Sequence, residues 1–134
     1  MEPEQIRDVA VTALEDIKAR DIEILDVHRL TSLFDWVIVA SADSSRQTRA
    51  LAHHVQEQAR LAGASRATLE GGASGEWILV DLGSVVVHVM QPAARDYYNL
   101  SELWGGHGLP RRPPALGMPL GMRRSEATGS GAAY

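Results

Sequence analysis

Apolar residues recur along the chain with two different periods, one typical of helices and the other of strands. Between residues 6 and 20 they return at every third or fourth position, which places one apolar stripe along an α-helix. A second helical stripe runs from residue 48 to residue 62. Ser44 and Gln47 precede it with the spacing of a capping box, and Gly63 is placed to end it. The pattern therefore predicts two amphipathic helices.

Shorter runs are rich in valine, isoleucine and leucine, the composition that favours β-strands. They cover residues 23–28, 35–41, 66–70 and 75–90, and the last is long enough for two strands joined by a turn. Pro92 then suits the first turn of a third, aromatic-rich helix, which is predicted to end at Gly105 and Gly106. The order α-β-β-α-β-β-β-α predicts a single small α/β domain with a sheet of about five strands flanked by helices.

The run from residue 75 to residue 90 predicts a β-hairpin with two chemically different faces. Gly83 and Ser84 have the composition of a two-residue turn, because glycine adopts positive φ without penalty. This turn pairs Leu82 with Val85, and side chains then alternate between the faces. One face is wholly aliphatic: Ile78, Val80, Leu82, Val85, Val87 and Val89. The other, called the mixed face below, holds Trp77, Leu79, Asp81, Val86, His88 and Met90.

The two faces are expected to pack against different structures. A uniform aliphatic face is suited to burial under helices. The mixed face is apolar but carries polar groups, which suits contact with a partner. The alternative is that a second layer of the same protein covers it, with Asp81 and His88 satisfied internally.

Composition changes after residue 104. Four of the six prolines and seven of the twelve glycines fall within residues 105–134, without apolar periodicity. The sequence therefore predicts a folded domain over residues 1–104 and a flexible, Pro/Gly-rich tail over residues 105–134.

Charge and composition exclude several classes of function. The net charge is −4 with acids and bases scattered, so the positive field of a nucleic-acid-binding protein is missing. The longest apolar runs fall short of the roughly 20 residues that span a bilayer, and no signal peptide is apparent. The absence of cysteine leaves neither disulfides nor thiolate chemistry. We expect a soluble, cytoplasmic protein that binds neither membrane nor nucleic acid directly.

Residue groups that could carry catalysis have simpler interpretations. His53 and His54 are adjacent on a predicted helix, point about 100° apart, and are badly placed to share a metal. Asp26 and Asp35 could form an acid–base pair near His28, but carboxylates at strand ends are usually solvated or capping.

Two candidate anion sites are equally weak. The serines at positions 41, 44 and 45 stand near a helix start, but the glycine-rich sequence that cradles phosphate is missing. The arginine doublets at 111–112 and 123–124 are too short for a phosphate-binding surface. No catalytic residue, metal site or cofactor is predicted.

The aromatic residues are concentrated instead. Trp77, Tyr97, Tyr98 and Trp104 all lie on the hairpin or the helix after it. Neighbours on a helix cannot both face inward, so Trp77 and one of the two tyrosines are candidates for an interface.

Four blocks of sequence, in the same order, resemble the ribosomal silencing factor family, also called Iojap. They are residues 34–41 with 44–47 and 51–52, then 70–71, then the hairpin over 77–90, and finally 95–104. The resemblance covers about residues 6 to 104. Ser84 departs from it, because relatives often carry an acid at that position.

The resemblance implies a mixed sheet of nucleotidyltransferase-like topology that acts by binding rather than by catalysis. Family members dock on large ribosomal subunit protein L-fourteen, block joining of the small subunit and repress translation when nutrients are short. Organellar relatives are associated with large-subunit assembly. Members can self-associate, so a homodimer is an open alternative. The positions matching the family's binding surface are Trp77, Asp81, Leu82, His88 and Tyr98, with Asp81 as the charged contact and Leu82 accessible at the hairpin end.

A nucleotide-handling enzyme is the alternative function. Nucleotidyltransferases of similar topology follow a Gly-Ser pair with two aspartates, which hold metal and triphosphate. Here Gly83 and Ser84 lead into Val85, Val86 and Val87, so those carboxylates are missing.

Overall fold

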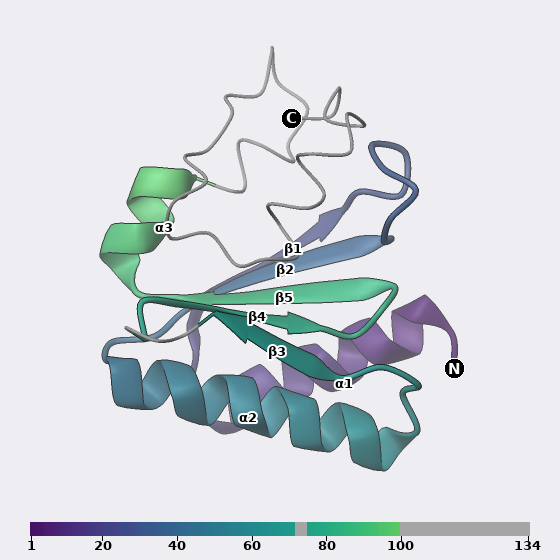
Figure 1. Cartoon of the computed structure of the whole chain (residues 1–134), viewed down its shortest axis with the longest axis horizontal. Helices are drawn as coiled ribbons and strands as arrows, with labels where there is room; N and C mark the ends of the chain where they lie inside the picture. The colour runs from purple at the N-terminus through teal and green to yellow at the C-terminus, as the bar shows by residue number, and fades with distance from the viewer. Residues whose placement is uncertain (72–74, 100–134) are drawn as a thin grey trace.

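The computed structural model describes residues 1–71 and 75–99, which form a mixed sheet with three helices (Figure 1). The elements are α1 (Pro3–Asp16), β1 (Arg20–Asp26), β2 (Trp36–Ser41), α2 (Ser45–Ala62), β3 (Thr68–Gly71), β4 (Trp77–Asp81), β5 (Val85–Met90) and α3 (Pro92–Tyr98). The predicted order of elements and the α/β class are confirmed.

The sheet has five strands in the order β1-β2-β5-β4-β3. β2 and β5 run parallel at its centre, and every other neighbouring pair is antiparallel. Figure 1 shows α1 and α2 together below the sheet, whereas α3 lies above it. In the part of the chain that the structure describes, no helix is long and apolar enough to cross a membrane.

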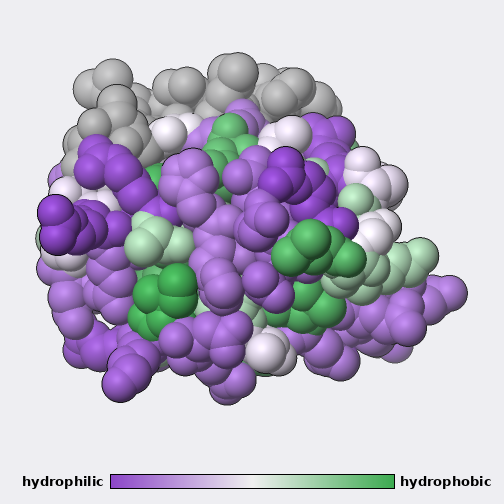
Figure 2. Space-filling model, turned by 90° about the horizontal axis from the view of Figure 1, so that it is seen from below, coloured by the Kyte–Doolittle hydropathy of each residue, from purple (hydrophilic) through white to green (hydrophobic). Residues whose placement is uncertain are grey.

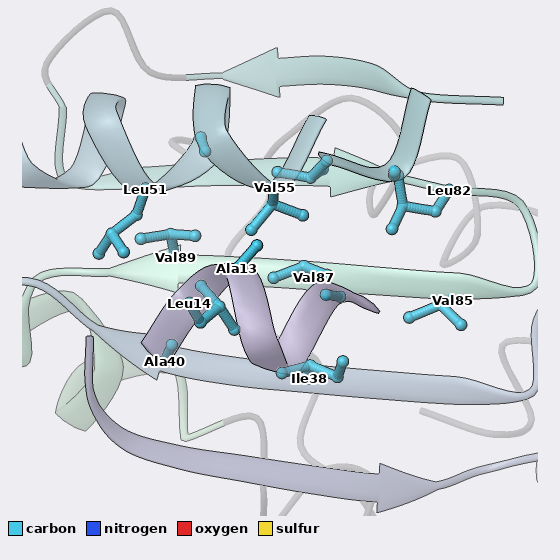
Figure 3. Packing of buried hydrophobic residues seen from close by; sticks show 14 of the residues in the cluster. Ala13, Leu14, Ile38, Ala40, Leu51, Val55, Leu82, Val85, Val87 and Val89 are labelled. Atoms are coloured by element: carbon cyan, nitrogen blue, oxygen red, sulfur yellow. The ribbon is translucent and has the colours of Figure 1, made fainter. Parts of the chain in front are cut away.

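The aliphatic face of the hairpin packs against α1 and α2, as predicted. All its residues lie in one buried cluster, together with Ile38 and Ala40 of β2, Leu14 of α1 and Leu51 and Val55 of α2 (Figure 3). Leu82 belongs to this cluster and is 2% exposed, so its expected accessibility at the hairpin end is wrong. The outer surface of the helical layer is mostly hydrophilic (Figure 2), as amphipathic helices require.

The hairpin turn forms where the sequence predicts it. Gly83 has a φ of 87°, and the amide of Leu82 donates to the carbonyl of Val85 at 2.9 Å. Ile78 lies opposite Val89. Only the first turn residue has positive φ, which is the position that glycine is expected to occupy in a two-residue turn.

Both predicted ends of α2 are confirmed, with one difference in the cap. The Ser44 hydroxyl accepts from the Gln47 amide at 3.1 Å, and Gly63 has a φ of 103°. The Gln47 side chain does not complete a capping box with Ser44, because its oxygen accepts from the Asp43 amide at 2.7 Å. Its nitrogen donates to the Ile17 carbonyl at 3.3 Å. Gln47 thus ties the start of α2 to the end of α1.

The end of the first helix and the start of the first strand differ from the prediction. α1 ends at Asp16 because Lys18 takes a φ of 59° and the Ala19 amide turns back to the Leu14 carbonyl at 3.0 Å. β1 then begins at Arg20 rather than at residue 23. A left-handed turn at a residue other than glycine or asparagine has no signal in composition.

The third helix is shorter than predicted. α3 starts at Pro92 as expected but ends at Tyr98, because the next residue, Asn99, adopts a left-handed conformation with a φ of 47°. The predicted continuation from residue 100 to Gly105 and the tail over 105–134 lie outside the described residues.

Candidate partner-binding surface

The mixed face lies on the side of the sheet away from α1 and α2, and most of it is buried. Trp77 is 4% exposed and His88 is fully buried, while Asp81 keeps partial exposure. Neighbouring side chains come from β2 and the segment before it, and from α3: Val27, Phe34, Val37, Val39, Ala94 and Tyr98. Residues of the same chain therefore pack against much of the mixed face.

Trp77 and His88 form the polar centre of this cluster. The Trp77 indole nitrogen donates to Nδ1 of His88 at 2.9 Å. Because Nδ1 accepts, the proton of the neutral imidazole lies on Nε2. Nε2 is buried and finds no hydrogen-bond partner in the described part of the chain. Burial lowers the pKa of His88 to about 3, so this histidine is neutral at pH 7.

Tyr98 and Tyr97 continue this arrangement to the surface. The ring of Tyr98 packs on Trp77 with centroids 4.5 Å apart, and Tyr97 meets Tyr98 edge-on at 5.0 Å. Burial raises the pKa of Tyr98, with smaller contributions from Tyr97 and Glu76. Tyr97 itself is 69% exposed.

The exposed member of the tyrosine pair is therefore Tyr97, which was not among the predicted binding residues. The spacing of residues along the helix could have identified Tyr97 as the exposed tyrosine. Ala94 and Tyr98 lie one helical turn apart and both pack against the mixed-face cluster, so Tyr97 points elsewhere.

Asp81 lies at the other end of β4 and is held by two contacts. One carboxylate oxygen accepts from the Gly83 amide at 2.9 Å, and the other pairs with the Arg66 guanidinium at 2.9 Å. The structure thus brings Trp77, His88 and Tyr98 together, places Asp81 beside the turn, and puts Leu82 on the opposite face.

Arg95 anchors α3 to the edge of the sheet. Its guanidinium donates to the Asp21 carbonyl at 2.5 Å and to the buried Ser41 hydroxyl at 2.8 Å, and it pairs with Glu23 at 2.6 Å. None of the residues of α3 is fully buried, so this helix depends on few contacts. Arg95 therefore fixes the position from which Tyr97 and Tyr98 are presented.

Replacing Arg95 by alanine is expected to lower the free energy of unfolding by about 1–3 kcal/mol, because it leaves the Ser41 hydroxyl and the Asp21 carbonyl without their donor. Urea denaturation measures the change. Arg95→Lys keeps the positive charge but not the planar guanidinium group. Its free energy of unfolding should lie between those of the parent and of Arg95→Ala. An Arg95→Ala midpoint equal to that of the parent would contradict this role.

Comparison with known proteins identifies the family. The family model described as "Ribosomal silencing factor during starvation" matches residues 1–129. The chain belongs to this family. A ribosomal silencing factor of Chromobacterium violaceum is 56% identical over 106 residues, covering 79% of this chain and 87% of that protein. A silencing factor of Bacillus subtilis is 37% identical over 105 residues, covering 78% and 89%.

A solved crystal structure supports the fold. A crystal structure of a protein from Chromobacterium violaceum superimposes with a TM-score of 0.76 at 52% identity, covering 87% of this chain and 95% of that one. The five-stranded sheet and its helices are therefore the fold of the ribosomal silencing factor family.

In this member of the family, several of the other groups considered for chemistry have local partners. Asp26 pairs with His28 at 2.5 Å, and that hydrogen bond lowers the pKa of Asp26. His54 pairs with Asp16 of α1 at 3.0 Å. Within residues 1–71 and 75–99, no group of three or more histidine and carboxylate side chains is placed to hold a metal ion.

Proposed function

We propose that this chain binds the large ribosomal subunit through ribosomal protein L-fourteen and blocks joining of the small subunit, which represses translation. The observation that carries the proposal is membership of the silencing factor family over residues 1–129. The relatives from Chromobacterium violaceum and Bacillus subtilis are named as ribosomal silencing factors.

The proposed contact surface joins the hairpin to α3. Asp81 and Tyr98 are the accessible members of the predicted set, and they supply a carboxylate and an aromatic ring. Trp77 packs against the Tyr98 ring and is itself held by its hydrogen bond to His88. Leu82 supports the turn from the aliphatic side. A net charge of −4 favours a basic protein over ribosomal RNA as the partner.

Sedimentation through a sucrose cushion tests the proposal. The full chain is expected to pellet with isolated large subunits in a saturable manner. It is also expected to slow subunit association, followed by light scattering, at the concentrations that saturate binding. A chain that stays in the supernatant well above the subunit concentration contradicts the proposal, and failure to bind purified L-fourteen contradicts that choice of partner.

Asp81→Asn is expected to weaken binding to large subunits roughly three- to tenfold, since a partly buried charged contact contributes about 1 kcal/mol. The amide oxygen can still accept from the Gly83 amide, so the turn should persist. Asp43→Asn is the matched control, because it removes the same charge from an exposed residue at the start of α2. Equal binding by the two variants would remove Asp81 from the contact surface.

A further inference from the structure

Tyr97 is a large, exposed aromatic side chain that is held in place. The residue is 69% exposed, and its ring lies nearly perpendicular to that of Tyr98 with centroids 5.0 Å apart. Tyr98 rests on Trp77, and Trp77 is hydrogen-bonded to His88. An aromatic ring that is both accessible and already ordered loses little conformational entropy on binding, which is the property of a binding hot spot.

An acidic side chain adjoins Tyr97. Asp96 is its exposed neighbour on α3. The only cation of α3 is Arg95, and its guanidinium is directed to Glu23 and Ser41. Arg95 therefore pairs with Glu23 rather than with Asp96.

An electron-rich ring face beside a carboxylate attracts a cation. Arginine and lysine side chains pack over aromatic rings for about 0.5–2 kcal/mol, and a carboxylate at the rim adds attraction at low salt. The same carboxylate repels phosphate, so ribosomal RNA fits this position poorly.

We propose that Tyr97 receives an arginine or lysine side chain of the protein partner, with Asp96 at the rim, and so extends the contact surface beyond Tyr98. This inference rests on the proposed binding to the large subunit. It adds a contact at the exposed side of α3 and states the chemistry of the partner group that lies there.

Sedimentation with isolated large subunits, repeated over a series of salt concentrations, tests the proposal through three substitutions of one residue. Tyr97→Ala is expected to weaken binding roughly 3- to 30-fold. Tyr97→Phe keeps the ring face and should bind within about twofold of the parent. Tyr97→Leu keeps apolar area without a ring, so it should resemble Tyr97→Ala. Thermal melting should show all three folded, since the side chain is exposed.

Charge provides an independent readout. Asp96→Asn should weaken binding at low salt and have little effect at high salt.

Leu61→Ala is the control for the Tyr97 substitutions. Leu61 is 72% exposed on α2, on the other side of the sheet, so this variant should bind like the parent.

Three results overturn the inference while leaving the proposed function intact. The first is a Tyr97→Ala variant that binds like the parent. The second is a Tyr97→Leu variant that binds like Tyr97→Phe, which would show that apolar area suffices. The third is an Asp96→Asn variant that binds more tightly, which would indicate an anionic neighbour such as RNA. If the parent itself does not pellet, the proposed function fails first.

Discussion

Trp77→Ala is expected to lower the free energy of unfolding by about 3–5 kcal/mol, the usual cost of truncating a buried aromatic residue. Trp77 is 4% exposed and lies between Tyr98 and His88. Its removal leaves a cavity under α3 and takes from His88 its hydrogen-bond donor. Because both effects occur in one buried cluster, we expect the largest stability loss of any substitution discussed for this chain.

Urea denaturation followed by circular dichroism measures this loss without relying on tryptophan fluorescence. Trp77→Phe is the informative control: it retains most of the ring volume but cannot donate to His88, so its loss should be smaller, about 1–3 kcal/mol. A loss below about 1 kcal/mol for Trp77→Ala would mean that the mixed face is not held by this side chain.

Acid is expected to destabilise the fold well above the range in which carboxylates titrate. The pKa of His88 is about 3 in the folded chain and about 6.5 when unfolded. Between these pH values the unfolded chain binds a proton that the folded chain does not. The contribution of His88 to the free energy of unfolding is therefore complete above pH 6.5 and is lost as the pH drops towards 3. The expected loss is about 2–3 kcal/mol between pH 6.5 and pH 4.5.

Urea midpoints measured across that pH range test the expectation. His88→Gln should remove most of the slope, because a glutamine amide oxygen can still accept from Trp77 but does not titrate. His53→Gln is the matched control, since His53 is exposed, and should retain the parental slope. A parental stability that stays constant from pH 6.5 to pH 4.5 would be incompatible with a buried, neutral His88. Asp26, whose folded pKa is lowered by His28, adds a loss only at lower pH.

Features that depend on residues near one another in the sequence were predictable. The turn at Gly83 and the division of the hairpin into two faces follow from a glycine at the reversal and from the period of the strands. The start of α2 at Ser44 and its end at Gly63 follow from the chemistry of helix ends. Each of these features is decided within a few residues.

Contacts between distant segments were not predictable. Arg95 reaches Asp21 and Glu23, more than seventy positions earlier in the chain. Arg66, just before β3, pairs with Asp81 at the end of β4. Tyr98 packs on Trp77, which leaves its neighbour Tyr97 at the surface. The left-handed conformation of Lys18, which ends α1 early, likewise has no local signal.

The sequence by itself determined the α/β class, the order of the elements and the membership of each face, because the period of apolar residues records which side chains point the same way. The family resemblance was also present in the sequence blocks. Only the tertiary structure decided what covers the mixed face: Trp77 and His88 are buried, and Tyr97 is exposed. Periodicity states which residues share a face, but burial depends on what the rest of the chain packs against that face, and that is a property of the folded chain alone.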